Sequence, residues 1–384
     1  MKKIPVAWLS LIHNPRRLAA ALAGVTFAVL LMFIEVGFLN GVYDSQTNLL
    51  NVLDADLFII NREKEDLLPS LPFSRRRLEQ AHAIPGVASA SPLYLEEFRA
   101  VFRNFDPDYT SGINVLGYRL ESSAILIPEL EEHREELQLA DTALADAGSR
   151  ELFGRLERGV GAELNGRRLN IVGEFTLGPN FRTDGLLIMS DQNFFRYFPD
   201  RNTGLADPGR VEFGLLKLAD GYDQDNVQAQ LSRYLPADII VLNRSEFIER
   251  IKRFWRELQP IGAVFGLGAA VGFLIGVAVC YQILYTDITD NLAQYATLKA
   301  LGSQNEYIIR LVIQKAALLG VGGFIFGLIL SMAIYDSLQS FSGIKMVLTP
   351  GRGVVIFLLS LGMCVMSGVV AVRRALRIDP AELF

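Results

Sequence analysis

The sequence predicts an α-helical membrane protein with four transmembrane helices and a large α+β domain outside the membrane. The chain has 384 residues, of which 51% are hydrophobic, so it is too apolar for an ordinary soluble protein. Four apolar runs are long enough to span a bilayer, whereas the stretch 41–257 contains none. These observations divide the chain into a membrane part and an aqueous part.

The first element is expected over residues 1–15, as a helix on the cytoplasmic membrane surface. Four residues share one apolar helical face, namely Ile4, Trp8, Leu11 and Ile12. The tryptophan and two nearby lysines favour a surface helix, with a disordered tail as the alternative. Asn14 and Pro15 end the element.

The transmembrane helices are predicted from the apolar runs and their flanks, at residues 16–40, 258–286, 308–335 and 353–372. The first run is longer than the apolar part of a signal peptide, and no small-residue cleavage site follows it, which indicates an uncleaved anchor. Between and after the later helices we expect a loop at 287–307, a short outer loop at 336–352 and a tail at 373–384.

Positive charge predicts the orientation of these helices. It gathers before the first helix, after the fourth, and in or beside the loop 287–307, at Lys2, Lys3, Arg16, Arg17, Lys299, Arg310, Arg373, Arg374 and Arg377. We therefore expect a multi-pass inner-membrane protein with both termini cytoplasmic and residues 41–257 periplasmic. A basic cluster at 250–256 is an exception, but the charge rule is weak within a large translocated domain.

Residues 41–257 are predicted to form an α+β domain built from two β-α-β halves. The first half has strands at 57–61 and 87–94 around a helix capped by Ser74, and the second has elements at 211–218, 226–235 and 238–242. Residues from about 105 to 205 are inserted between the halves, with a strand at 185–190 and a type I′ hairpin turn at Asn165 and Gly166. A helix at 245–259 is expected to continue into the second transmembrane helix, either to carry motion or as a passive stalk.

The loop 287–307 contains a predicted short helix at 291–301, capped by Asp290 and ended by Gly302. Its apolar residues lie on more than one face, at Leu292, Tyr295, Ala296, Leu298 and Leu301. A short exposed helix of this kind needs a partner groove, or else it rests on the inner leaflet.

Two segments resemble ABC exporter permeases of the MacB/FtsX superfamily. Residues 294–302 resemble the E-x-A-x-L-K/R-A-x-G stretch of that family, with Gln294 in place of the usual glutamate. The tail 373–384 looks like the R-A-x-x-x-D-P ending, in which an aspartate and a proline suit the start of a last helical turn. Residues 281–290 and 73–78 are similar to the DevC branch, the heterocyst-type exporter permeases.

The resemblance implies a homodimer that works with two copies of a separate ABC ATPase, which docks on the helix between the second and third spans. The implied coupling residues are Asn291, Leu292, Gln294, Tyr295, Ala296, Thr297, Leu298, Lys299, Ala300, Leu301 and Gly302. It also implies a MacB-like outer domain that meets a membrane-fusion adaptor and, through it, a TolC-like outer-membrane duct. ATP-driven motion would reach this domain by mechanotransmission, and DevC-like members export glycolipid-type envelope material.

No catalytic chemistry is expected on this chain. The sequence contains no P-loop, no G-x-S-x-G motif and three isolated histidines, so we expect no cofactor, no metal and no catalytic residue, with ATP hydrolysis on a partner subunit. The net charge of −5 without a basic patch argues against nucleic acid. Cys280 and Cys364 lie in apolar runs, where packing is favoured over a disulfide.

Several residues inside the spans are candidates for packing or function. Gly268, Gly272 and Gly276 form one face of the second span and are expected at close helix contacts, within the subunit or across a dimer. Glu35 in the first span is either functional or a hydrogen-bonded residue near the interface. Lys315 in the third span is expected to snorkel to the membrane surface.

Three functions follow from these observations. The leading hypothesis is an exporter permease coupled to an ATPase and in contact with the lipid bilayer. The alternatives are an FtsX-like scaffold that regulates cell-wall hydrolases, and a LolC/E-like permease that releases lipoproteins. An outer domain of more than 200 residues, spanning 41–257, favours the MacB-like layout over the smaller FtsX loop.

Overall fold

The computed structural model describes residues 6–67, 70–97, 99–105, 108–150, 153–178, 184–201, 209–300, 302, 304–342 and 344–376. The chain forms two compact units. Met1–Gly41 and Pro260–Phe384 make the first, which contains the membrane helices, and Val42–Gln259 makes the second, which is the α+β domain.

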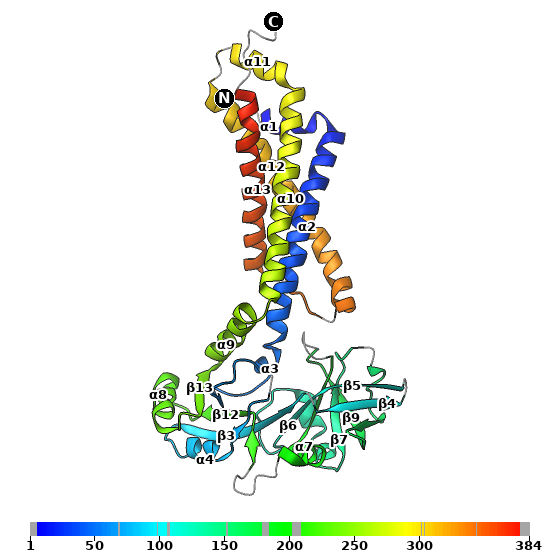
Figure 1. The fold of residues 1–384 in the computed structure, drawn as a ribbon, viewed down its shortest axis with the longest axis vertical. Helices are drawn as coiled ribbons and strands as arrows, with labels where there is room; N and C mark the ends of the chain where they lie inside the picture. The colour runs from blue at the N-terminus through cyan, green and yellow to red at the C-terminus, as the bar shows by residue number, and fades with distance from the viewer. Residues whose placement is uncertain are drawn as a thin grey trace. The chain divides into compact units, whose positions relative to one another are not determined.

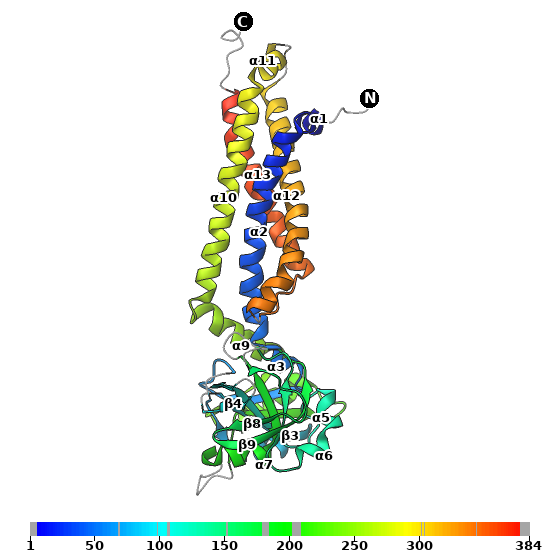
Figure 2. The same cartoon turned by 90° about the vertical axis from the view of Figure 1, so that its right-hand side faces the viewer.

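The first unit is a bundle in which four long helices run side by side (Figures 1 and 2). They are α2 (Pro15–Ser45), α10 (Ile261–Asp290), α12 (Asn305–Ser342) and α13 (Pro350–Leu376). Each is long and apolar enough to cross a membrane, which confirms the four predicted transmembrane helices. Cys280 and Cys364 are buried free thiols in this bundle, as expected for packing residues.

Two short helices lie at the same end of the bundle, α1 (Val6–Ile12) and α11 (Leu292–Ala300) (Figures 1 and 2). Leu11 of α1 packs against the bundle core, while Trp8 and Ile12 remain exposed. The apolar face predicted for this helix therefore only partly packs against the bundle. Ile4, the fourth residue of that face, lies outside the described residues.

The described part of the second unit contains an eleven-stranded sheet in the order β13-β1-β12-β3-β6-β10-β7-β9-β8-β4-β5. Its strands are β1 (Leu57–Asn61), β3 (Val87–Glu96), β4 (Val101–Phe105), β5 (Asp108–Gly112), β6 (Asn114–Tyr118), β7 (Thr142–Asp146), β8 (Gly161–Leu164), β9 (Arg167–Phe175), β10 (Leu186–Ser190), β12 (Phe213–Leu218) and β13 (Ile239–Asn243). A second sheet pairs β2 (Phe73–Ser74) with β11 (Arg210–Val211). The helices are α3 (Asn48–Asn51), α4 (Arg76–His82), α5 (Pro128–Glu132), α6 (Arg134–Leu137), α7 (Asp191–Tyr197), α8 (Gln224–Tyr234) and α9 (Arg244–Glu257).

The two predicted β-α-β halves are present, and their strands interleave. The first half is β1-α4-β3 and the second is β12-α8-β13, and β1 pairs antiparallel with both strands of the second half. Because β12 also pairs with β3, the order β13-β1-β12-β3 is that of a ferredoxin-like split β-α-β unit. The inserted strands continue the same sheet, since β6 pairs with β3.

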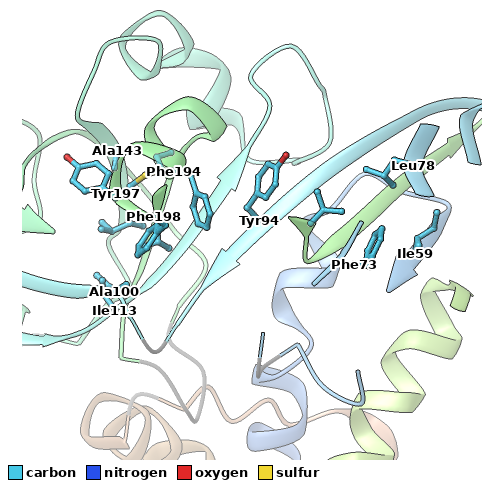
Figure 3. Packing of buried hydrophobic residues seen from close by; sticks show 14 of the residues in the cluster. Ile59, Phe73, Leu78, Tyr94, Ala100, Ile113, Ala143, Phe194, Tyr197 and Phe198 are labelled. Atoms are coloured by element: carbon cyan, nitrogen blue, oxygen red, sulfur yellow. The ribbon is translucent and has the colours of Figure 1, made fainter. Parts of the chain in front are cut away.

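A continuous hydrophobic core joins the halves to the insert. Figure 3 shows Tyr94 of β3 between Phe194 of α7 on one side and Phe73 and Leu78 on the other. The rings of Tyr94 and Phe194 stack with centroids 5.6 Å apart. Burial raises the pKa of Tyr94 to about 12, so its hydroxyl stays neutral at ordinary pH.

Local turn and capping predictions had mixed outcomes. The hairpin at Asn165 and Gly166 is confirmed, with φ of 53° and 73°, as a type I′ turn requires. Ser74 belongs to β2 and Arg75 occupies the N-cap of α4, but the Ser74 hydroxyl still accepts from the N–H of Arg76, the first residue of the helix, at 3.4 Å. The prediction of one helix that continues into the second span is also wrong. α9 ends at Glu257 and α10 starts at Ile261, because Pro260 disfavours helix in the residue before it.

The basic cluster at 250–256 has partners inside the domain. Arg250 donates to the carbonyls of Arg62 and Lys64, each at 2.8 Å, and also pairs with Glu65. Lys252 lies 4.0 Å from Asp44. These contacts attach α9 to the residues that follow β1 and to Asp44, which gives this charge a structural role in the domain.

Candidate functional site

The candidate coupling helix α11 begins at a sharp turn after α10. Asp290 does not cap α11, as the sequence suggested, because α10 continues through it and its carboxylate contacts the guanidinium of Arg17. Asn291 instead closes α10: its side-chain amide donates to the carbonyl of Asp287 at 2.8 Å and to its Oδ1 at 3.2 Å. The carbonyl of Asn291 then accepts from the N–H of Tyr295, which starts α11.

A buried ion pair lies directly beneath this turn. Lys315 Nζ of α12 donates to Asp287 Oδ2 of α10 at 2.7 Å, and the two side chains are 2% and 13% exposed. The expected snorkelling of Lys315 is therefore wrong, because a carboxylate inside the bundle satisfies its charge. The sequence offered one signal for this pair, namely a carboxylate and a lysine near the ends of neighbouring apolar helices.

Tyr295 of α11 completes the cluster. Its hydroxyl lies 3.5 Å from Lys315 Nζ and its ring centroid 5.9 Å from the same atom. Tyr295 is 3% exposed and Ala296 is fully buried beside it. Burial, and to a lesser extent the nearby Asp287 carboxylate, raises the pKa of the Tyr295 hydroxyl, so it stays protonated.

This burial corrects the expectation that Tyr295 inserts into an ATPase groove, because the ring already fills a site in its own chain. The outward side of α11 consists of Ala293, Gln294 and Thr297, which are exposed. Leu292, Leu298 and Lys299 are half-buried, and Gly302 has a φ of 86°, which suits its expected position after the helix. The side chain of Ala300 and all of Leu301 lie outside the described residues.

The predicted glycine face of α10 packs against helices of the same subunit. A Cβ atom at Gly276 would lie 2.2 Å from Met363 Sδ and 3.0 Å from Ala28 Cβ. A Cβ at Gly272 would meet Leu31 and Met32 of α2 at ordinary van der Waals distance, 3.5 Å. The glycines thus allow α10 to approach α2 and α13 closely within one chain.

Glu35 and Gly268 lie side by side on α2 and α10. A Cβ at Gly268 would lie 2.4 Å from the Glu35 carboxyl carbon, so the glycine makes room for that group. Glu35 is half-buried and makes no hydrogen bond or ion pair with the residues that the structure describes. Glu35 thus places a polar group inside the first span, as the sequence indicated, and Gly268 leaves room for it.

The class of protein follows from these features: a multi-pass membrane protein with a large α+β domain and a short helix fastened to one end of its bundle. Comparison with known protein families then shows which family part of the chain matches. Residues 266–380 match the FtsX-like permease C-terminal family. This region contains α11, most of α10, α12, and α13.

Two relatives support this match at low identity. The lipoprotein-releasing system transmembrane protein LolE of Haemophilus influenzae is 27% identical over 161 residues, which are 41% of this chain and 35% of LolE. The macrolide export ATP-binding/permease protein MacB of Agrobacterium fabrum is 21% identical over 173 residues, 44% of this chain and 26% of MacB. The match thus spans about a third of LolE and a quarter of MacB. Residues 266–380 thus carry an FtsX-like permease C-terminal domain, and the chain is similar to LolE and MacB over less than half of its length.

Among solved structures, the periplasmic region of MacB from Actinobacillus actinomycetemcomitans aligns with a TM-score of 0.36 at 10% identity. The alignment covers 54% of this chain and 98% of that structure.

Proposed function

We propose that the chain is the permease subunit of an ABC exporter, in which a separate ATPase docks on α11 and drives the α+β domain by mechanotransmission. The observation that carries this proposal is the attachment of α11. Tyr295, on the inner side of α11, contacts the ion pair of Asp287 and Lys315. A force on α11 therefore acts on α10 and α12 together. The outer side of α11, at Gln294 and Thr297, is exposed and available to a partner.

Orientation and assembly belong to the same proposal. α11 and both termini lie in the cytoplasm, where ATP is available, and residues 41–257 lie in the periplasm. The permease works as a homodimer with two ATPase copies, and the outer domain meets a membrane-fusion adaptor leading to a TolC-like duct. The resemblance of residues 281–290 to the DevC branch favours glycolipid-type envelope material as cargo.

Lipoprotein release is the second candidate. LolE, whose name describes a lipoprotein-releasing system, matches this chain at higher identity and over more of its own length than the MacB relative does. Co-purification separates the two functions. An adaptor that binds the chain supports export, and a lipoprotein held by the chain until ATP is added supports release.

The ATPase docking is tested by enlarging the outer side of α11. We expect Thr297→Trp to abolish co-purification of the ATPase that accompanies the wild-type chain, because a bulky ring prevents close approach to an exposed helix face. The melting temperature should not change, since Thr297 is exposed. His13→Trp is the matched control, because His13 is also exposed and lies next to α1. Wild-type ATPase yield with Thr297→Trp would show that α11 is not the docking helix.

A further inference from the structure

Along the first half of strand β3, one edge pairs with no strand in the part of the chain that the structure describes. The strand pairs with β12 from Val87 to Leu93, but with β6 only from Leu93 to Glu96. The Leu93 carbonyl accepts from the N–H of Glu212, at 3.1 Å, on the β12 side. Because backbone groups alternate along an antiparallel strand, half-buried Ala90 directs its N–H and carbonyl to the opposite edge. Pro92, which is buried and has no N–H, lies where the pairing with β6 begins.

This open edge borders a groove of about 420 Å³. Glu79 and His82 of α4 line one wall, and Arg119 and Glu121, in the loop after β6, line another. The floor is made of small residues of β3, namely Ser89, Ala90 and Ser91. Small side chains beside unpaired backbone groups leave room for a further strand.

The strand register shows which wall each floor residue faces. Ser89 lies opposite Lys217 and Ser91 opposite Leu215, so both serines share the face of Lys217. Ala90 lies on the other face, where it packs against the core beneath α4. A strand added here would therefore present alternate side chains to two different walls.

The charges of the groove favour a basic occupant. Lys217 is neutralised by Asp54 at 2.5 Å and Asp56 at 3.7 Å. The carboxylates of Glu79 and Glu121 make no hydrogen bond or ion pair with any residue that the structure describes, and both line the groove. Among the described residues that line the groove, Arg119 is the cation left to oppose these two carboxylates, so the lining keeps a negative excess.

We propose that this groove binds an extended, basic polypeptide segment of a partner protein, which adds to the sheet as a strand beside Ala90. Backbone bonds to the N–H and carbonyl of Ala90 would supply affinity, and Glu79 and Glu121 would select lysine or arginine side chains. The proposal goes beyond ATPase coupling and does not depend on it, because all the residues involved lie in the α+β domain.

The test measures binding of a fluorescein-labelled hexapeptide, with four consecutive lysines between two threonines so that lysines face both walls, to the full chain in lipid nanodiscs, by fluorescence anisotropy. We expect saturable binding, and a loss of about three- to tenfold in affinity for Ala90→Pro, which removes one outward N–H. This change spares the β12 pairing, because the N–H of Ala90 points away from β12. Ala90→Ser keeps the N–H and nearly the same volume, and should bind as the wild type does.

Two further probes make the result independent of how well the Ala90→Pro chain folds. The same peptide with alternate backbone nitrogens methylated, and a version with glutamate for lysine, should both bind the wild-type chain at least about threefold more weakly. Absence of saturable binding to the wild type overturns the proposal. So does equal affinity for the methylated and unmethylated peptides, because the occupant would then not be held as a strand.

Discussion

The helices α11 and α9 are both held to their units by buried charge, but in different ways. The buried contacts of α11 centre on Tyr295, whose ring lies over the ion pair of Asp287 with Lys315, and on Ala296 beside it. α9 is attached at many points: Trp255 donates to Asp66 at 3.2 Å, and Arg250 donates to two backbone carbonyls. We expect a helix whose buried contacts centre on one ion pair to respond to one local change, and a helix with several charged attachments to move with its domain.

A network of buried charges lies in the same unit as α9 and includes Lys64, whose carbonyl accepts from Arg250 of α9. Glu212 accepts from Lys64 at 3.3 Å and from Arg201 at 2.9 Å, and Arg201 also donates to Glu96 at 2.8 Å. Burial lowers the pKa of Lys64, and the carboxylate of Glu212 partly offsets this effect. Each charge in the network thus depends on several neighbours, whereas Lys315 depends mainly on one.

Removing the centre of the network should have the largest effect on stability. Glu212→Ala leaves Lys64 and Arg201 buried without their shared carboxylate, and we expect a loss of about 3–5 kcal/mol in the free energy of unfolding. Denaturant unfolding followed by tryptophan fluorescence measures it. Glu249→Ala is the control, because Glu249 pairs with Arg256 on the surface and should cost less than about 1 kcal/mol. Equal midpoints for the two variants would mean that the network tolerates the loss of its centre.

Breaking the single pair beneath α11 should cost somewhat less, about 3 kcal/mol, because Asp287 keeps some contact with solvent. Lys315→Met leaves that carboxylate without its cation, so α11 should loosen and ATPase co-purification should fall. Adding Asp287→Asn removes the unpaired charge and should restore most of the melting temperature. If the double variant is no more stable than Lys315→Met, the pair is not what holds α11.

Glycine packing offers a third comparison, within α10. Gly276→Ala should lower stability by about 1–3 kcal/mol, because the new methyl group collides with Met363 and Ala28. Gly266→Ala should be neutral or slightly stabilising, since nothing lies within 4 Å of its Cβ position and alanine favours helix. Thermal unfolding measures both variants. A larger loss at Gly266, with reduced dimer content in native mass spectrometry, would place a subunit contact there.

Local sequence signals predicted the elements but not their connections. The spans, the two β-α-β orders and the turn at Asn165 could be predicted, because length, periodicity and turn chemistry act over a few residues. The burial of Tyr295 could not, since its partner Lys315 lies on a different helix and a lysine in an apolar run normally suggests snorkelling. Similarly, the insertion of β1 between β12 and β13 depends on contacts between distant segments.

The smallest effect on stability is expected when the Tyr295 hydroxyl is removed. Comparing this change with loss of the whole side chain separates the contribution of the ring from that of the hydroxyl. Tyr295→Phe removes only a contact of 3.5 Å to Lys315, so it should cost less than about 1 kcal/mol near neutral pH and leave ATPase co-purification intact. Tyr295→Ala removes the ring as well and should cost about 3 kcal/mol or more, through the cavity it leaves.

The two variants should also differ in alkaline solution. Because burial raises the pKa of Tyr295 in the folded chain, the stability that the neutral phenol contributes is complete below the unfolded pKa of about 10 and is lost as pH rises through the folded value. Melting temperatures recorded from about pH 8 to pH 11 should therefore fall less steeply for Tyr295→Phe than for the wild type. If the melting temperatures of the two proteins fall equally with pH, the hydroxyl is hydrated in the folded chain. α11 would then be held less tightly than α9, even where its ring is buried.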